Sequence, residues 1–174
     1  MKALLDSKEV DSILQQLAEQ LLQKHPDFNN TVLVGIQQGG ALVSAYLYAI
    51  LSSKKNLQQI NHGQLDITFY RDDVRHKIMA PDTMNLPFSI EGKTVILVDD
   101  VLFTGRTIKA ALDALLDYGR PERVELCVLI DRSEHRQFPI QPDYRGRKVE
   151  SKKSDKLKFI RTESGDPQVI LISQ

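Results

Sequence analysis

The stretch Thr94-Val-Ile-Leu-Val-Asp-Asp-Val-Leu-Phe-Thr-Gly-Arg-Thr107 decides the fold class of this chain. Its first part, Thr94–Val98, is apolar and rich in β-branched residues, which is typical of a strand buried on both faces. Two adjacent acids, Asp99 and Asp100, come next, and a helix is predicted from Thr107 to Leu116. A buried strand that leads through a short loop into a helix is a unit of an α/β fold with a parallel sheet.

The segment Thr104-Gly-Arg-Thr107 predicts a binding cup for a terminal phosphate. A helix N-terminus presents unpaired N–H groups and the positive end of the helix dipole, and a glycine lets the backbone approach an anion closely. Asp99 and Asp100 are placed to accept hydrogen bonds from the vicinal hydroxyls of a sugar. The alternative is a threonine that only caps the helix, beside two solvated acids. That alternative does not explain why the acids and the cup are adjacent.

Two common phosphate-binding patterns are absent from the sequence. Gly92-Lys93-Thr94 resembles the end of a Walker A motif, but it precedes a strand and lacks the earlier glycine. The G-x-G-x-x-G dinucleotide fingerprint is also missing. The predicted phosphate cup is therefore of another kind.

Strands and helices alternate on both sides of the opening stretch. Asp6 and Glu9 have capping-box spacing and start a predicted amphipathic helix that ends near Lys24. The remaining predicted elements are strands at 31–36, 65–70 and 124–130, a turn at 37–40, a helix at 41–51, and weaker strands at 157–161 and 169–172. We therefore predict an α/β fold with a mostly parallel twisted sheet, helices on both faces, and ligands beyond the carboxyl ends of the strands. The charged, aperiodic stretch 71–92 predicts a long functional loop.

Length and composition indicate one folded domain over residues 1–174. Apolar residues make up 41% of the 174-residue chain, which is too apolar for a disordered chain. The single cysteine, Cys127, excludes an intramolecular disulfide and a cysteine-based metal cluster. No apolar run is long enough to span a bilayer, and the N-terminus turns polar too early for a secretory signal. We therefore expect a cytoplasmic protein without a membrane partner.

The net charge of zero conceals a basic segment near the C-terminus. Eight basic and two acidic residues lie between Arg145 and Arg161, so this segment carries +6 and the rest of the chain −6. Such a segment can bind phosphate or nucleic acid, but a run of lysines is more often a solvated face.

These residues resemble a known family. Val95–Thr107 is similar to the phosphoribosyl pyrophosphate (PRPP) signature of type I phosphoribosyltransferases. The segments around it resemble the PyrR family of bifunctional pyrimidine-operon regulators: Leu65–Asp73, Ala110–Leu115 with Tyr118–Pro121, Asp131-Arg132, His135-Arg136 and Pro139-Ile140. The resemblance covers most of residues 31–150. It implies a type I phosphoribosyltransferase fold with a flexible flap at about 71–92 and a small irregular or β hood at about 132–174.

The resemblance implies an activity and its partners. The chain would convert uracil and PRPP to UMP and diphosphate, with Mg²⁺ arriving on PRPP and no direct metal ligand. It would also bind pyrimidine-operon mRNA in response to UMP or UTP, and would form a homodimer or homotetramer.

The resemblance also implies site residues at the matching positions. Asp99 and Asp100 would be catalytic, and PRPP or nucleotide would be bound by Gln38, Gly39, Arg71, Asp99, Asp100, Val101, Leu102, Phe103, Thr104, Gly105, Arg106 and Thr107. Ile130, Asp131 and Arg132 would bind the base. RNA would contact His135, Arg136, Arg147 and Lys148. Arg71 and Arg132 would offset charge on the leaving pyrophosphate, with a surface salt bridge as the alternative for each.

The first loop departs from the family pattern. The family places Thr-Arg-Gly or Arg-Arg-Gly after the Gly-Ile strand end, whereas this chain has Gln37-Gln38-Gly39-Gly40. A positive charge is therefore missing where pyrophosphate should bind. Charge-assisted hydrogen bonds contribute about 1.5–3 kcal/mol each, so a roughly ten- to hundredfold loss of affinity or rate is expected.

The loop after Ile130 departs as well. It is one residue longer than in the family and places Glu134 beside His135, and Gln141 replaces a family arginine. We therefore expect weaker RNA binding than in the family.

Two alternative functions stay open. A nucleotide-sensing RNA regulator with little transferase activity would agree with the missing arginine. A hypoxanthine or guanine phosphoribosyltransferase would agree with Pro142-Asp-Tyr-Arg-Gly146, which is similar to a stretch of those enzymes. They carry a lysine where this chain has Gln141, and usually Glu-Asp where it has Asp99-Asp100, so both details favour a pyrimidine.

Overall fold

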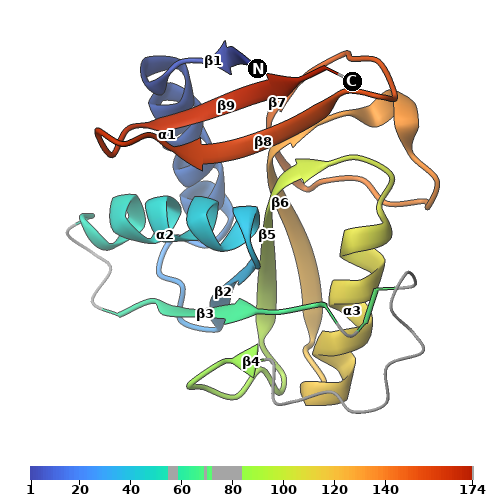
Figure 1. Cartoon of the computed structure of the whole chain (residues 1–174). Helices are drawn as coiled ribbons and strands as arrows, with labels where there is room; N and C mark the ends of the chain where they lie inside the picture. Colours follow the sequence, from blue (N-terminus) through green and yellow to red (C-terminus); the bar gives the residue numbers. More distant parts are fainter. Residues whose placement is uncertain (55–58, 69, 72–83, 174) are drawn as a thin grey trace.

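The main sheet has six strands in the order β4-β3-β2-β5-β6-β7 (Figure 1). The structure, a computed structural model, describes residues 1–54, 59–68, 70–71 and 84–173. Five strands are parallel: β2 (Thr31–Ile36), β3 (Asn61–Leu65), β5 (Thr94–Leu102), β6 (Arg123–Asp131) and β7 (Tyr144–Lys148). The short β4 (Met84–Asn85) runs antiparallel to β3 at one edge.

Helices cover both faces of this sheet, as predicted. α1 (Ser7–Lys24) and α2 (Gly39–Ser52) lie on one face and α3 (Arg106–Tyr118) on the other (Figure 1). Alternate residues of β5 reach the two resulting cores: Ile96 and Val98 pack with α1 and α2, and Val95 and Leu97 pack with α3. Because both faces are buried, the strand is apolar from Val95 to Val98, directly before its two acids.

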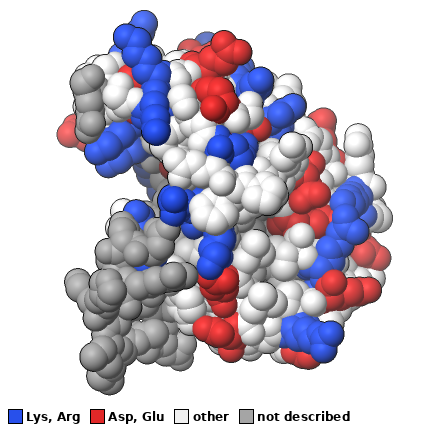
Figure 2. Space-filling model, turned by 90° about the vertical axis from the view of Figure 1, so that its right-hand side faces the viewer, with Lys and Arg blue, Asp and Glu red and all other residues white. Residues whose placement is uncertain are grey.

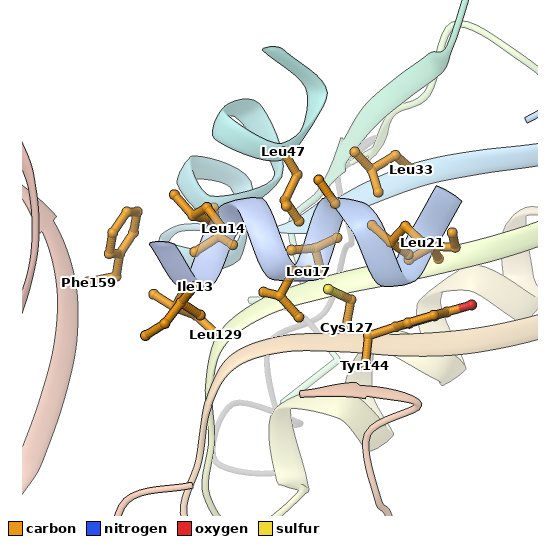
Figure 3. Close-up of a cluster of buried hydrophobic side chains, with 14 of the residues drawn as sticks. Ile13, Leu14, Leu17, Leu21, Leu33, Leu47, Cys127, Leu129, Tyr144 and Phe159 are labelled. Carbon is orange, nitrogen blue, oxygen red and sulfur yellow. The ribbon is translucent and has the colours of Figure 1, made fainter. Parts of the chain in front are cut away.

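The core beneath α1 is built from residues far apart in the sequence. Asp6 and Glu9 form the predicted capping box, and the helix then buries a leucine-rich stripe. Figure 3 shows this stripe packed on side chains from the sheet, α2 and the C-terminal strands; the labelled residues are Ile13, Leu14, Leu17, Leu21, Leu33, Leu47, Cys127, Leu129, Tyr144 and Phe159. Each fully buried leucine contributes about 1.5–3 kcal/mol.

A second, three-stranded antiparallel sheet lies over α1 and α2. It consists of β1 (Lys2–Leu5), β9 (Pro167–Ile172) and β8 (Lys156–Arg161), in that order. We call this sheet the hood; both chain ends belong to it (Figure 1). The weak strand signals at 157–161 and 169–172 are thus confirmed. β1, β4 and β7 were not predicted. β1 is a four-residue edge strand, β4 has two residues within the predicted loop, and β7 is rich in arginine and lysine.

Two of the predicted strands differ from the structure by more than two residues at a boundary. The strand predicted at 65–70 is wrong in position, since β3 ends at Leu65 and Asp66 instead accepts two hydrogen bonds from Thr68 in a turn. β5 continues to Leu102, so Asp99 and Asp100 lie inside a strand rather than in a loop. The predicted flap at 71–92 falls largely on residues 72–83, which lie outside the described part of the chain.

The order of strands in the main sheet changes direction between β2 and β5. β3 lies on one side of β2, whereas β5, β6 and β7 follow on the other side. Open α/β sheets bind ligands at such a switch point. Among the described residues, no helix is long and apolar enough to cross a membrane.

Candidate active site

The acid pair lies at the carboxyl end of β5, with one carboxylate more exposed than the other. Asp99 is 5% exposed and Asp100 is half-buried. Asp100 lies beside the start of α2, where a Cβ built on Gly39 would fall 2.2 Å from its Oδ2. Glycine at position 39 is therefore required for this close approach.

The two carboxylates are held by backbone N–H groups. Asp99 Oδ1 accepts from Asp100 N at 3.0 Å, and Asp100 Oδ1 accepts from Val101 N at 2.9 Å. Asp100 Oδ2 also accepts from Phe159 N of the hood at 3.3 Å. The hood thus touches the more accessible acid directly.

Burial raises the pKa of Asp99 well above its usual value, and the neighbouring negative charge of Asp100 raises it further. As the pH rises, the pair therefore reaches two full negative charges later than two isolated acids would. Carboxyl oxygens that are already fixed by the backbone can accept hydrogen bonds from a sugar without further ordering.

The predicted phosphate cup has the expected geometry. Gly105 has a φ of +92°, in the left-handed region that favours glycine, and α3 begins at the next residue. Gly105 has no side chain to cap the helix, while the Thr104 hydroxyl accepts from Arg106 N at 3.3 Å. Thr104 is thus a partial cap, as the alternative interpretation proposed, and the first turn of α3 faces the end of β5. We call residues 103–107 the phosphate loop.

The first loop lies beside the acid pair. The peptide between Gln37 and Gln38 is cis, and Gln37 is tied to β3 by hydrogen bonds to Leu65 O and Gln64 Oε1. A Cβ on Gly40 would meet Val98 O at 2.3 Å, so α2 starts in close contact with β5. The structure therefore brings Gln38 and Gly39 together with Asp100, as the sequence predicted.

The three residues predicted to bind the base are closed off in this conformation. Ile130, Asp131 and Arg132 are 0, 1 and 2% exposed. Ile130 belongs to the core under α1, and Asp131 forms ion pairs with Arg136 and Arg145. A contact of these residues with a base stays a prediction.

Arg132 is buried and forms no salt bridge with any residue that the structure describes, so the alternative of a surface salt bridge is wrong for this residue. Its guanidinium donates to Lys152 O at 2.8 Å and Asp155 O at 2.9 Å, and it stacks 4.0 Å from the Phe103 ring. Burial lowers its pKa, against the opposing effect of Glu134 and Asp155. Arg132 thereby fixes the segment before β8; a role on pyrophosphate stays a prediction. Arg71 is exposed and precedes residues outside the described part.

A three-residue segment, of which the sequence analysis singled out only Arg136, supports the phosphate loop from outside. We call residues 136–138 the bracket. Thr104 O accepts from Gln137 N at 2.9 Å and from Phe138 N at 3.2 Å. Arg106 Nε donates to Gln137 Oε1 at 2.9 Å, and its guanidinium lies 5.3 Å from the centre of the Phe138 ring. No sequence pattern reveals these contacts, because they join residues 31 or more positions apart.

Of the residues predicted to bind RNA, Arg136 belongs to the bracket and His135 directly precedes it. His135 is hydrogen-bonded through Nε2 to Ser151 O, and Arg147 pairs with Glu9 of α1 at 3.0 Å. Lys148 is exposed, and basic side chains gather over the upper part of the molecule in Figure 2, where the hood lies. A cavity of about 700 Å³ opens beside the bracket, lined by Gln20, Asp131, Ser133, Arg136, Phe138, Pro139, Ile140, Gln141, Pro142, Asp143 and Arg145.

The described residues include no group of three or more histidine, cysteine, aspartate or glutamate side chains that could hold a metal. Mg²⁺ prefers oxygen ligands and keeps several waters, so it is often bound by substrate phosphates together with one or two carboxylates. The acid pair fits that pattern better than a site built by the protein alone.

Comparisons with known proteins agree with this geometry. The phosphoribosyl transferase domain family matches residues 1–164 of the chain. "Bifunctional protein PyrR" of Nostoc punctiforme is 42% identical over 171 residues, covering 97% of this chain and 95% of that protein. The protein of the same name from Haemophilus ducreyi is 43% identical over 177 residues, covering 98% and 96%.

Solved structures show the same fold. A hypoxanthine phosphoribosyltransferase from Staphylococcus aureus superposes with a TM-score of 0.69 at 24% identity, covering 87% of this chain and 80% of that one. The HGPRT-ase of Leishmania tarentolae in complex with GMP gives 0.68 at 16% identity, covering 87% and 82%. At such low identity the likeness concerns the fold alone.

The fold and the match to the domain family define the class of this chain as a type I phosphoribosyltransferase. Within this class, the chain is 42% and 43% identical to the two PyrR proteins over nearly its whole length. It therefore belongs to the PyrR family.

Proposed function

We propose that this chain transfers the phosphoribosyl group of PRPP to uracil, and that UMP or UTP controls its binding to pyrimidine-operon mRNA. The observation that carries the proposal is the acid pair beside the phosphate loop at the switch point of the sheet. The full-length identity to proteins named PyrR supports the pyrimidine and regulatory parts.

In the proposed reaction, the bond from ribose C1 to the diphosphate oxygen breaks and a bond from C1 to uracil N1 forms, while the N1 proton is released. Asp99 and Asp100 hold the ribose hydroxyls, and Thr104–Thr107 hold the 5′-phosphate through backbone N–H groups and hydroxyls. Catalysis by these residues is positioning together with electrostatic stabilisation. Mg²⁺, bound to PRPP, supplies positive charge next to the leaving diphosphate.

Release of pyrophosphate from PRPP and Mg²⁺, measured separately with uracil, hypoxanthine and guanine, tests the proposal. Turnover is expected with uracil alone. Turnover with a purine base and none with uracil would contradict the pyrimidine assignment.

The second candidate function is a nucleotide-sensing RNA regulator with little turnover. It is favoured by the first loop, which carries glutamines and glycines beside Asp100 and no arginine. UMP binding without turnover with any base would support it over the transferase. RNA affinity that falls steeply with salt would support the regulatory part of both candidates.

A homodimer or homotetramer is the proposed assembly. Sedimentation of the full chain with and without UMP measures it, and a monomer under both conditions would contradict this part of the proposal.

A further inference from the structure

A tyrosine side chain of α2 joins this helix to the hood. The Tyr46 hydroxyl donates to Gly165 O at 3.3 Å and accepts from Arg161 Nε at 3.1 Å. Its half-buried ring packs edge-on against Phe159, with the ring centres 5.9 Å apart. Arg161 is the last residue of β8, and Gly165 lies in the turn between β8 and β9. The side chain of Tyr46 therefore contacts β8 in its middle, at its end and at the turn that follows.

The start of α2 touches the acid pair. Gly39, the first residue of the helix, lies against Asp100, and Tyr46 follows about two helical turns later. The hood reaches the same carboxylate, because Phe159 N donates to Asp100 Oδ2 at 3.3 Å. Asp100 thus contacts both α2 and β8, and Tyr46 fixes how these two elements lie relative to each other.

The place of β8 in the hood explains why a backbone N–H is available to Asp100. β8 is the last strand in the order β1-β9-β8. Alternate N–H groups of an edge strand point away from the neighbouring strand and can donate to other acceptors. Phe159 is in register with Val169 of β9, and its ring belongs to the buried cluster shown in Figure 3. The direction of the Phe159 N–H group therefore depends on where β8 as a whole lies.

We propose that Tyr46 is a positioning residue for ribose binding: its hydroxyl fixes β8 on α2, and Phe159 N–H then holds the Asp100 carboxylate where it accepts a ribose hydroxyl. The inference rests on the proposed function, in which the acid pair binds the ribose of PRPP and UMP. A carboxylate oxygen accepts more than one hydrogen bond, so Asp100 Oδ2 binds the hood and the sugar together. Tyr46 acts through β8 and not by contact with the ligand.

Two tyrosines on the same helix allow a matched comparison. Tyr46→Phe removes the hydroxyl and keeps the ring that packs on Phe159. Tyr48→Phe makes the same change at an exposed residue, whose ring stacks on His62 of β3 with the ring centres 4.9 Å apart. Calorimetry measures the affinities of the unchanged chain and of both variants for UMP and for 2′,3′-dideoxy-UMP. The second ligand lacks the hydroxyls that the proposed function assigns to the acid pair.

We expect Tyr46→Phe to bind UMP about fivefold more weakly, since the net contribution of a hydrogen bond corresponds to a few-fold change in affinity. Its affinity for 2′,3′-dideoxy-UMP should equal that of the unchanged chain, and Tyr48→Phe should leave both affinities unchanged. The KM for PRPP should rise by a similar factor in Tyr46→Phe with little change in kcat, because the ribose hydroxyls are bound in the ground and transition states alike.

An unchanged affinity of Tyr46→Phe for UMP would overturn the inference. So would an equal loss for UMP and 2′,3′-dideoxy-UMP, because Asp100 would then not carry the effect, or an equal loss in Tyr48→Phe. A purely structural role of Tyr46 would lower the melting temperature without changing the ratio of the two affinities, and this result would also contradict the inference. Failure of the proposed function has a different signature, namely no UMP binding by the unchanged chain, and the inference falls with it.

Discussion

At the scale of single residues, the site depends on two carboxylates in different environments. Asp99 is buried and holds its proton more readily, whereas Asp100 is half-buried and lies against the backbone of Gly39. Asp100 also accepts a hydrogen bond from the hood through Phe159 N. A ribose that binds Asp100 must therefore share or displace this hood contact.

Asp100→Asn should weaken UMP binding about tenfold, because a charge-assisted acceptor for a sugar hydroxyl becomes a neutral one. Asp99→Asn should have the same direction of effect. Isothermal titration of UMP measures both, and the affinity for free uracil should stay unchanged. Asp113→Asn, on the exposed side of α3 and paired with Lys109, is the control. Unchanged UMP affinity in both site variants would disprove the ribose assignment.

At the scale of elements, the loop between β2 and α2 sets the charge available to pyrophosphate. The close packing of α2 on β5 holds Gln38 and Gly39 next to the acids. The loop offers amide donors there but no formal positive charge.

Gln38→Arg should lower the KM for PRPP, or raise kcat/KM, by roughly ten- to hundredfold, since it adds a charge-assisted donor. Pyrophosphate release at subsaturating PRPP is the measurement. Gln37→Arg is the matched control. It adds the same charge, but at a side chain that is hydrogen-bonded to Gln64 of β3. If both variants gain equally, general attraction of PRPP rather than a specific contact is responsible.

At the scale of the whole molecule, a buried carboxylate outside the acid pair joins α1 to the sheet. Glu125 of β6 is 1% exposed, and four side chains converge on it: Lys24, His25, Arg123 and Tyr144. Burial alone would raise its pKa, but hydrogen bonds from Lys24, Tyr144 and His25 outweigh that effect and lower the pKa to about 2. The end of α1, β6 and β7 are thus held together by one ionised group.

Glu125→Gln should destabilise the fold by about 3 kcal/mol, because it leaves cations and a buried hydroxyl without their anionic partner. The melting temperature should fall by roughly 10 °C, and Glu19→Gln, on the exposed face of α1, should change little. Because the pKa is lower in the folded chain than its usual 4.5, the contribution is present above pH 4.5 and is lost as the pH falls toward 2. Between these pH values, the unfolding free energy of the variant should therefore fall less with decreasing pH than that of the unchanged chain. A variant with the same pH dependence as the unchanged chain would contradict this assignment.

Much of the fold and the phosphate loop could be predicted from the sequence, because their determinants are local. Val95–Val98 are apolar at every position since both sheet faces are covered, and Gly105 adopts a positive φ that favours glycine. The capping box at Asp6 and Glu9 is likewise a matter of three-residue spacing. Hydrophobic periodicity and backbone preference act over a few residues, so the sequence displays them directly.

Only the tertiary structure decided which distant segments support the site. The bracket on the phosphate loop, the hood contact on Asp100 and the burial of Arg132 beneath the segment 152–155 all join residues that no spacing relates. For the same reason β1 and β7 were missed: they are strands because β9 and β6 supply their hydrogen-bond partners. Strand pairing and side-chain contacts across the chain depend on the packing of the whole fold, and local preference alone does not determine them.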